Sequence, residues 1–127
     1  MDLRLSKHFN LREFSCKCSR KCKYKGVTPV SSELVAVLEL LRERAKCPIK
    51  INCALRCPTH NRDVGGAMHS QHLYGTAADV RCDHLKPIDM YRFLDKLFPN
   101  TYGLGLYDTF LHVDVRKMRA RWDKSTK

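Results

Sequence analysis

The chain lacks an apolar run long enough to cross a membrane. A spanning helix needs about 20 consecutive apolar residues, and the longest apolar segment is interrupted by Glu33, Glu39 and Arg42. Residues 1–8 also lack the apolar centre of a secretory signal. We therefore expect synthesis in the cytoplasm without a signal peptide, so that action outside the cell would require another factor to release the protein.

Internal repeats and low-complexity stretches are absent as well, which excludes solenoid and fibrous architectures. A length of 127 residues suffices for one hydrophobic core. We predict a single domain over 1–127, with a basic, cysteine-rich loop at 15–28 and a basic C-terminal tail at 116–127.

Acidic residues are scarce: 13 Asp and Glu stand against 24 Lys and Arg, a net charge of +11. Such an excess indicates either a solubilising surface or attraction to a polyanion, such as nucleic acid or an anionic bacterial envelope polymer. Nucleic-acid binding would need base-reading or stacking elements. The sequence shows no helix-turn-helix spacing and no aromatic platform, so we do not expect a nucleic-acid partner.

The paired Cys-x-x-Cys spacing of common zinc modules is also missing. Seven cysteines, an odd number, argue against a complete disulfide framework. Cys16, Cys18 and Cys22, with Cys57 as a fourth ligand, offer the donors of a second, structural zinc, but we expect reduced thiols or one or two adventitious disulfides instead. The other three cysteines flank apolar positions and are predicted to be small core residues: Cys47, Cys53 and Cys82.

Hydrophobic periodicity predicts alternating short helices and strands. The expected helices cover 5–14, 33–46, 58–64 and 87–97, and the expected strands cover 49–53, 76–81, 104–107 and 110–115. Strands in runs with helices on one side favour an α+β fold, in which helices flank a small antiparallel sheet.

A ten-residue motif carries the clearest chemistry. Residues 70–79 read Ser-Gln-His-Leu-Tyr-Gly-Thr-Ala-Ala-Asp and offer His72 and Asp79, and the predicted strand 110–115 offers His112. Two imidazoles and one carboxylate fill three positions of a tetrahedral Zn²⁺ and leave the fourth for water, as in hydrolytic zinc sites. We therefore predict one catalytic Zn²⁺ held by His72, Asp79 and His112.

The Ser-x-His-x-x-Gly-x-Ala-x-Asp signature, followed by His-x-Asp at 112–114, resembles the M15 zinc peptidases. That family comprises D-Ala-D-Ala carboxypeptidases and peptidoglycan endopeptidases, and the resemblance extends from about Leu5 to Trp122. It implies an α+β zinc fold and a peptidoglycan or muropeptide substrate. We expect a monomer. The same resemblance implies that Arg56 and Ser70 bind the substrate.

The proton acceptor is where the sequence departs from the family. Many relatives place an acidic residue three positions before the last histidine ligand, where this chain has Thr109. Asp108, on the predicted hairpin turn, and Asp114, on the same strand face as His112, are the two candidate catalytic carboxylates. We favour Asp108 as the base and Asp114 as the group that orients His112, with the opposite assignment as the alternative.

These features together predict a zinc-dependent peptidase of bacterial peptidoglycan stem peptides, either a D,D-carboxypeptidase or an endolysin-type endopeptidase. Small size, positive charge and the missing signal suit a phage or prophage lysis protein that acts in the cell wall or periplasm. A cytoplasmic enzyme that trims recycled muropeptides is the alternative setting. The alternative function is a non-catalytic zinc-binding module of the same fold, as in Hedgehog signalling domains.

Overall fold

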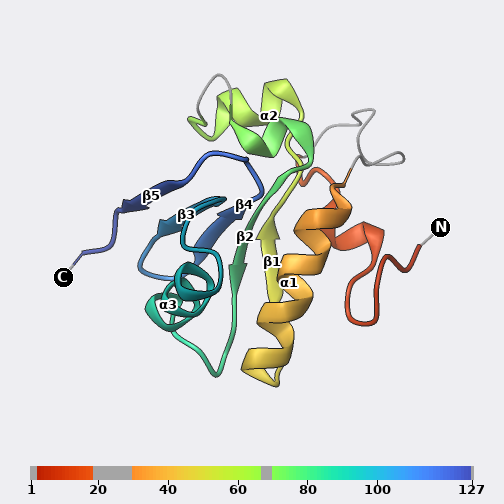
Figure 1. The fold of residues 1–127 in the computed structure, drawn as a ribbon. Helices are drawn as coiled ribbons and strands as arrows, with labels where there is room; N and C mark the ends of the chain where they lie inside the picture. The colour runs from red at the N-terminus through yellow and green to blue at the C-terminus, as the bar shows by residue number, and fades with distance from the viewer. Residues whose placement is uncertain (1–2, 19–29, 67–69, 127) are drawn as a thin grey trace.

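The computed structural model describes residues 3–18, 30–66 and 70–126. Its centre is a five-stranded sheet with the strand order β1-β2-β4-β3-β5 (Figure 1). The strands are β1 (Lys50–Cys53), β2 (Ala77–Arg81), β3 (Gly103–Leu106), β4 (Leu111–Asp114) and β5 (Ala120–Asp123). The pairs β1–β2, β2–β4 and β4–β3 are antiparallel, whereas β5 runs parallel to β3.

Helices α1 and α3 cover one face of this sheet, and α2 lies at one end of it (Figure 1). The α-helices are α1 (Ser32–Ala45), α2 (Pro58–Asp63) and α3 (Pro87–Leu97), and two 3₁₀ turns are η1 (Leu11–Phe14) and η2 (Gln71–Tyr74). Ser31 caps α1 by accepting the Leu34 N–H at 3.3 Å, and α2 and α3 each begin with proline. None of the helices described is long and apolar enough to span a membrane.

The hydrophobic core lies between the helices and one face of the sheet. Alternation along the strands puts one set of side chains into this core and the next set on the opposite face. The core-facing strand residues pack with buried residues of α1 and α3: Ala78, Val80, Leu104, Leu111 and Val113 from the sheet, and Leu34, Leu38, Leu41, Met90 and Leu94 from the helices. Burial of each of these leucines stabilises the folded state by about 1.5–3 kcal/mol.

The opposite face carries a row of register partners that crosses all five strands. Cys53 of β1 pairs with Asp79 of β2, and Asp79 pairs with His112 of β4. His112 pairs with Gly105 of β3, and Gly105 pairs with Trp122 of β5. Since partners in adjacent strands lie about 5 Å apart with side chains on one face, this row brings residues from distant parts of the sequence together.

The α+β prediction is confirmed, and the helices and strands expected from periodicity form within a few residues of their predicted bounds, the N-terminal helix being confined to η1. The sheet is mixed rather than purely antiparallel, because part of the predicted tail forms β5. β5 lacks an alternating apolar pattern; it is held by pairing with β3 and by Arg121. The Arg121 guanidinium donates hydrogen bonds to Asp95, Tyr102 and Phe98, each at 2.7 Å. Most of the predicted basic loop 15–28 lies outside the described residues.

Candidate metal centre

The three predicted metal ligands converge on the face of the sheet opposite α1 and α3. His72 Nε2 and His112 Nδ1 each lie 3.2 Å from Asp79 Oδ1, and the two imidazole rings are 5.1 Å apart. All three side chains belong to buried residues. Asp79 and His112 are cross-strand partners of β2 and β4, and η2 delivers His72.

Local hydrogen bonds fix η2 in this position. The Ser70 hydroxyl accepts the His72 N–H at 3.2 Å, and the Arg56 N–H donates to the His72 carbonyl at 2.9 Å. Gly75, with φ of 73°, ends the turn in the left-handed region that favours glycine. The glycine in the sequence motif therefore serves to turn the chain from His72 into the strand that carries Asp79.

The outer nitrogen of each imidazole is held by a protein acceptor. His72 Nδ1–H donates to the Ala54 carbonyl at 2.6 Å, and His112 Nε2–H donates to Asp114 Oδ2 at 2.7 Å. The neutral rings then direct the lone pairs of His72 Nε2 and His112 Nδ1 toward Asp79. Asp79 Oδ1 thus faces one nitrogen of each imidazole, and two nitrogens with one carboxylate oxygen form a donor set that suits Zn²⁺.

Both carboxylates beside the imidazoles are ionised at neutral pH. Burial raises the pKa of Asp79, but hydrogen bonds and positive charge from His112 and His72, when the nitrogens that face Asp79 are protonated, outweigh burial and hold the pKa well below its usual range. A bound Zn²⁺ would take the place of those protons. Burial likewise raises the pKa of Asp114, and hydrogen bonds from His112 and Arg116 more than offset it. Asp114 is fully buried, and Arg116 donates to it from Nε and Nη2, each at 2.7 Å. A carboxylate so strongly stabilised as an anion is a poor proton acceptor and a good orienting group.

Replacement of Asp114 by asparagine is expected to weaken zinc binding by about 10-fold or more. The amide keeps the shape of the side chain but loses the charge that holds the proton on His112 Nε2. Competition with a chelator measures the affinity. Asp83→Asn, at an exposed position with a surface ion pair to Lys50, is the matched control. Equal zinc affinity in both variants would show that Asp114 does not orient His112.

An open cavity of about 760 Å³ lies over the three converging side chains. It brings together five of the residues that the sequence predicted for the site: Arg56, Ser70, His72, Asp79 and His112. Its other walls combine aromatic and cationic side chains with Val64, Gly65, Gly66 and Gln71; the aromatic and cationic ones are Tyr107, Phe110, Arg116, Trp122 and Lys124. Tyr107 and Phe110 stack with ring centres 4.4 Å apart.

Arg56 is fixed in the wall of this cavity. Its Nη1 donates to Asn61 Oδ1 at 3.1 Å and its Nε donates to Cys53 Sγ at 3.3 Å. Its Nη2 lies 3.7 Å from Asp79 Oδ2. Gly66 approaches so closely that an added Cβ would collide with the side chains of Asn61 and Arg56. The guanidinium is therefore positioned before any substrate arrives.

The structure does not bring Asp108 into the cavity. Its carboxylate accepts hydrogen bonds from the N–H and the hydroxyl of Thr126, each at 2.8 Å, and it lines a separate cavity with Lys86 and Arg92. The turn after β3 directs the side chain toward the C-terminal segment instead of the imidazoles. The structure thus engages Asp108 with Thr126 outside the main cavity, and its role as the base stays a prediction. Among the described residues that line the main cavity, Asp79 is the only carboxylate.

Sequence reasoning missed two neighbours of the centre, Cys53 and Trp122. Cys53 was expected in the core, but ligand atoms of Cys53, His72 and Asp79 all lie within 4.8 Å of one another. Burial raises the pKa of the Cys53 thiol. The Trp122 ring lies 5.0 Å from the His112 ring. Both residues belong to the register row, and only the strand pairing, which the sequence does not specify, reveals them.

Gly105 leaves the space that Trp122 occupies, because an added Cβ would collide with the indole. Gly105→Ala is expected to displace Trp122 from His112, to cost about 1–3 kcal/mol of stability and to shift the emission of the chain's single tryptophan. Fluorescence and thermal unfolding measure both effects. Gly103→Ala, on the same strand, would instead collide with the Asp114 carboxylate, so it should lower zinc affinity and change the emission less. Unchanged emission in Gly105→Ala would contradict this packing.

Two imidazoles, one carboxylate and a fixed arginine around an open cavity are the groups that a metallohydrolase centre requires. A family model described as Peptidase M15 matches residues 7–114, which is most of the chain. The chain belongs to this peptidase family and is therefore a zinc-dependent metallopeptidase in general. No curated protein matches the chain.

Proposed function

We propose that this metallopeptidase hydrolyses peptide bonds of bacterial peptidoglycan stem peptides, as a D,D-carboxypeptidase or an endolysin-type endopeptidase. The observation that carries the proposal is the fixed Arg56 guanidinium, which lies in the cavity wall 3.7 Å from the Asp79 carboxylate of the metal centre. A guanidinium fork binds a carboxylate through two parallel charge-assisted hydrogen bonds. Stem peptides carry carboxylates close to the bonds that such enzymes cleave.

The chain's own residues prepare the site for this reaction. When bound by His72, Asp79 and His112, Zn²⁺ would supply a Lewis acid that polarises the scissile carbonyl and activates water. Ala54 and Asp114 hold the outer protons of the two imidazoles, so the inner nitrogens stay available as donors of electron pairs. Arg56 would bind a substrate carboxylate, and the Ser70 hydroxyl, which lines the cavity, would donate a hydrogen bond to the peptide.

The charge of the cavity favours an anionic peptide. Three cations line it, Arg56, Arg116 and Lys124, against two carboxylates, Asp79 beside Arg56 and the buried Asp114 that Arg116 pairs with. Tyr107, Phe110 and Trp122 add a wall for apolar parts of the substrate. The net charge of +11 would attract the whole protein to anionic envelope polymers. These features suit a phage or prophage lysis protein acting in the cell wall or periplasm after another factor opens the membrane.

A second candidate function is metal-dependent binding of wall peptides without cleavage. It is favoured by one observation: in the described part of the cavity lining, no carboxylate besides Asp79 is present to accept a proton. Asp114 is buried and engaged by His112 and Arg116, and Asp108 lies elsewhere. The two candidates share the metal centre and differ only in turnover.

Incubation of the zinc-loaded protein with purified peptidoglycan, followed by mass analysis of the soluble products, separates the candidates. Released D-alanine would identify a carboxypeptidase, and released muropeptide fragments with new termini would identify an endopeptidase. The Asp79→Asn variant controls for contaminating hydrolases. Sedimentation of the protein with the wall material but no new termini would favour the binding module. If no products are released and the protein does not sediment with the wall material, peptidoglycan is rejected as the substrate.

A further inference from the structure

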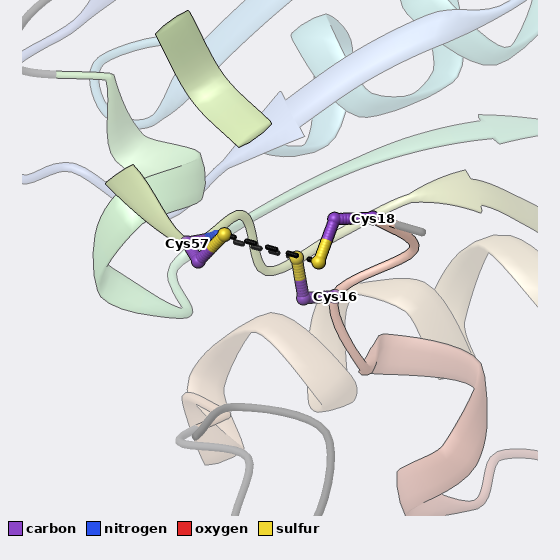
Figure 2. Close-up of side chains that lie close together, drawn as sticks. All are labelled: Cys16, Cys18 and Cys57. Carbon is purple, nitrogen blue, oxygen red and sulfur yellow. Dashed lines mark hydrogen bonds between the residues drawn. The ribbon is translucent and has the colours of Figure 1, made fainter. Parts of the chain in front are cut away.

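Three cysteines outside the metal centre form a separate buried cluster. Cys16 and Cys18 follow η1, and Cys57 is the residue before α2, 41 and 39 positions further along the chain. Figure 2 shows the three sulfur atoms turned toward one another from these two segments. The ligand atoms all lie within 4.8 Å of one another, and the residues are only 2%, 4% and 5% exposed.

The spacing of the sulfur atoms fits a shared metal ion better than a disulfide. Cys18 Sγ and Cys57 Sγ are 4.0 Å apart, about twice the S–S bond length of roughly 2.05 Å. Two thiolates on a tetrahedral Zn²⁺, each at about 2.3 Å, stand about 3.8 Å apart. The observed separation is therefore close to one edge of a zinc–thiolate tetrahedron.

Backbone donors face two of the sulfur atoms, whereas burial raises the pKa of the Cys16 thiol to about 11, so loss of its proton would depend on the bound metal ion. The Cys57 N–H donates to Cys16 Sγ at 3.3 Å, and the His60 N–H donates to Cys57 Sγ at 3.4 Å. Such backbone donors stabilise negative charge on metal-bound sulfur. The three side chains form a hydrophobic cluster of their own, apart from the main core.

We propose that Cys16, Cys18 and Cys57 bind a second Zn²⁺ as a structural site. Binding would release the thiol protons and join the segment after η1 to the start of α2. The described residues supply three thiolates; Cys22, which the sequence suggested as another ligand, lies outside them. This site does not depend on the proposed peptidase function.

The position of the cluster gives the ion a structural role in the cavity wall. Cys57 directly follows Arg56, and the Leu55 N–H donates to the Phe14 carbonyl at 3.1 Å. The same short stretch thus ties the N-terminal segment to the wall that carries Arg56. α2 also carries Asn61, which holds the Arg56 guanidinium. A zinc ion at the three cysteines would brace this wall without contacting the substrate.

The test uses a full-length double variant, His72→Ala with Cys53→Ser, which removes the first centre and the thiol beside it. Protein purified under reducing conditions with zinc is analysed for metal content and by X-ray absorption at the zinc edge. The proposal predicts about one zinc per chain, with a sulfur shell near 2.3 Å. No bound zinc, or zinc surrounded only by nitrogen and oxygen, would overturn it.

A second comparison assigns the sulfur ligands. Adding Cys57→Ser to the double variant should remove the remaining zinc, whereas adding Cys47→Ser, a buried cysteine elsewhere, should leave it. Equal retention in both would overturn the assignment. If Cys57→Ser fails to fold, the presence or absence of a sulfur shell in the double variant still decides whether the cysteines bind zinc. If His72, Asp79 and His112 do not bind zinc, the wild-type protein will hold only sulfur-bound zinc, so this failure is distinguished from failure of the cysteine site.

Discussion

His72→Ala is expected to abolish peptidase activity and to remove the zinc ion from the cavity. The imidazole is almost fully buried, and its Nε2 faces the same Asp79 oxygen as His112 Nδ1. Loss of one of three protein ligands leaves a carboxylate and one imidazole, too few to hold a catalytic zinc tightly. The variant should also unfold at a lower temperature, because metal binding contributes to folding free energy.

Metal analysis, a peptide-release assay and thermal unfolding measure these effects of His72→Ala. His84→Ala, at an exposed position away from the cavity, is the matched control and should behave as wild type. Zinc added to both proteins should raise the unfolding temperature of the control much more than that of His72→Ala. A fully active His72→Ala variant would exclude this residue from the metal centre.

Arg56→Lys is expected to lower kcat/KM by roughly 10- to 100-fold, the equivalent of losing one charged hydrogen bond of about 1.5–3 kcal/mol. Lysine retains the positive charge but not the planar fork that binds a carboxylate through two hydrogen bonds. Lysine also cannot reproduce the two hydrogen bonds, to Asn61 and to Cys53, that fix the guanidinium. The loss should be largest on substrates with a carboxylate beside the scissile bond and small on substrates where that carboxylate is amidated.

Steady-state kinetics on such a pair of peptides measures the effect of Arg56→Lys. Arg81→Lys, whose side chain is about half exposed at the end of β2, is the control for a general effect of replacing arginine. Zinc content should be the same in all three proteins. If Arg56→Lys cleaves both peptides at the wild-type rate, Arg56 does not anchor the substrate.

The elements with strong local signals could be predicted from the sequence. The apolar stripe of α1, its serine cap and the prolines that begin α2 and α3 are local features, so their bounds followed from nearby residues. The ten-residue motif also fixed His72 and Asp79 within one short stretch of chain. Its glycine at position 75 takes the left-handed conformation that the turn between the two requires.

The remaining parts of the site depend on pairing between distant segments. β5 has little strand signal of its own, and its parallel pairing with β3 is what places Trp122 beside His112. Cys53 reaches the centre only because β1 pairs with β2. Asp108 lies four residues before His112, yet the turn directs its carboxylate to Thr126. Sequence distance from a ligand was a poor guide to side-chain direction at that turn.

The most direct test of the account is a crystal structure of the zinc-loaded protein with anomalous data at the zinc edge. We predict a peak in the cavity about 2.0–2.2 Å from His72 Nε2, from an Asp79 carboxylate oxygen and from His112 Nδ1. The outer nitrogens should keep their hydrogen bonds to Ala54 and Asp114. A cavity without a zinc peak, or a peak from which any of these three side chains points away, would contradict it.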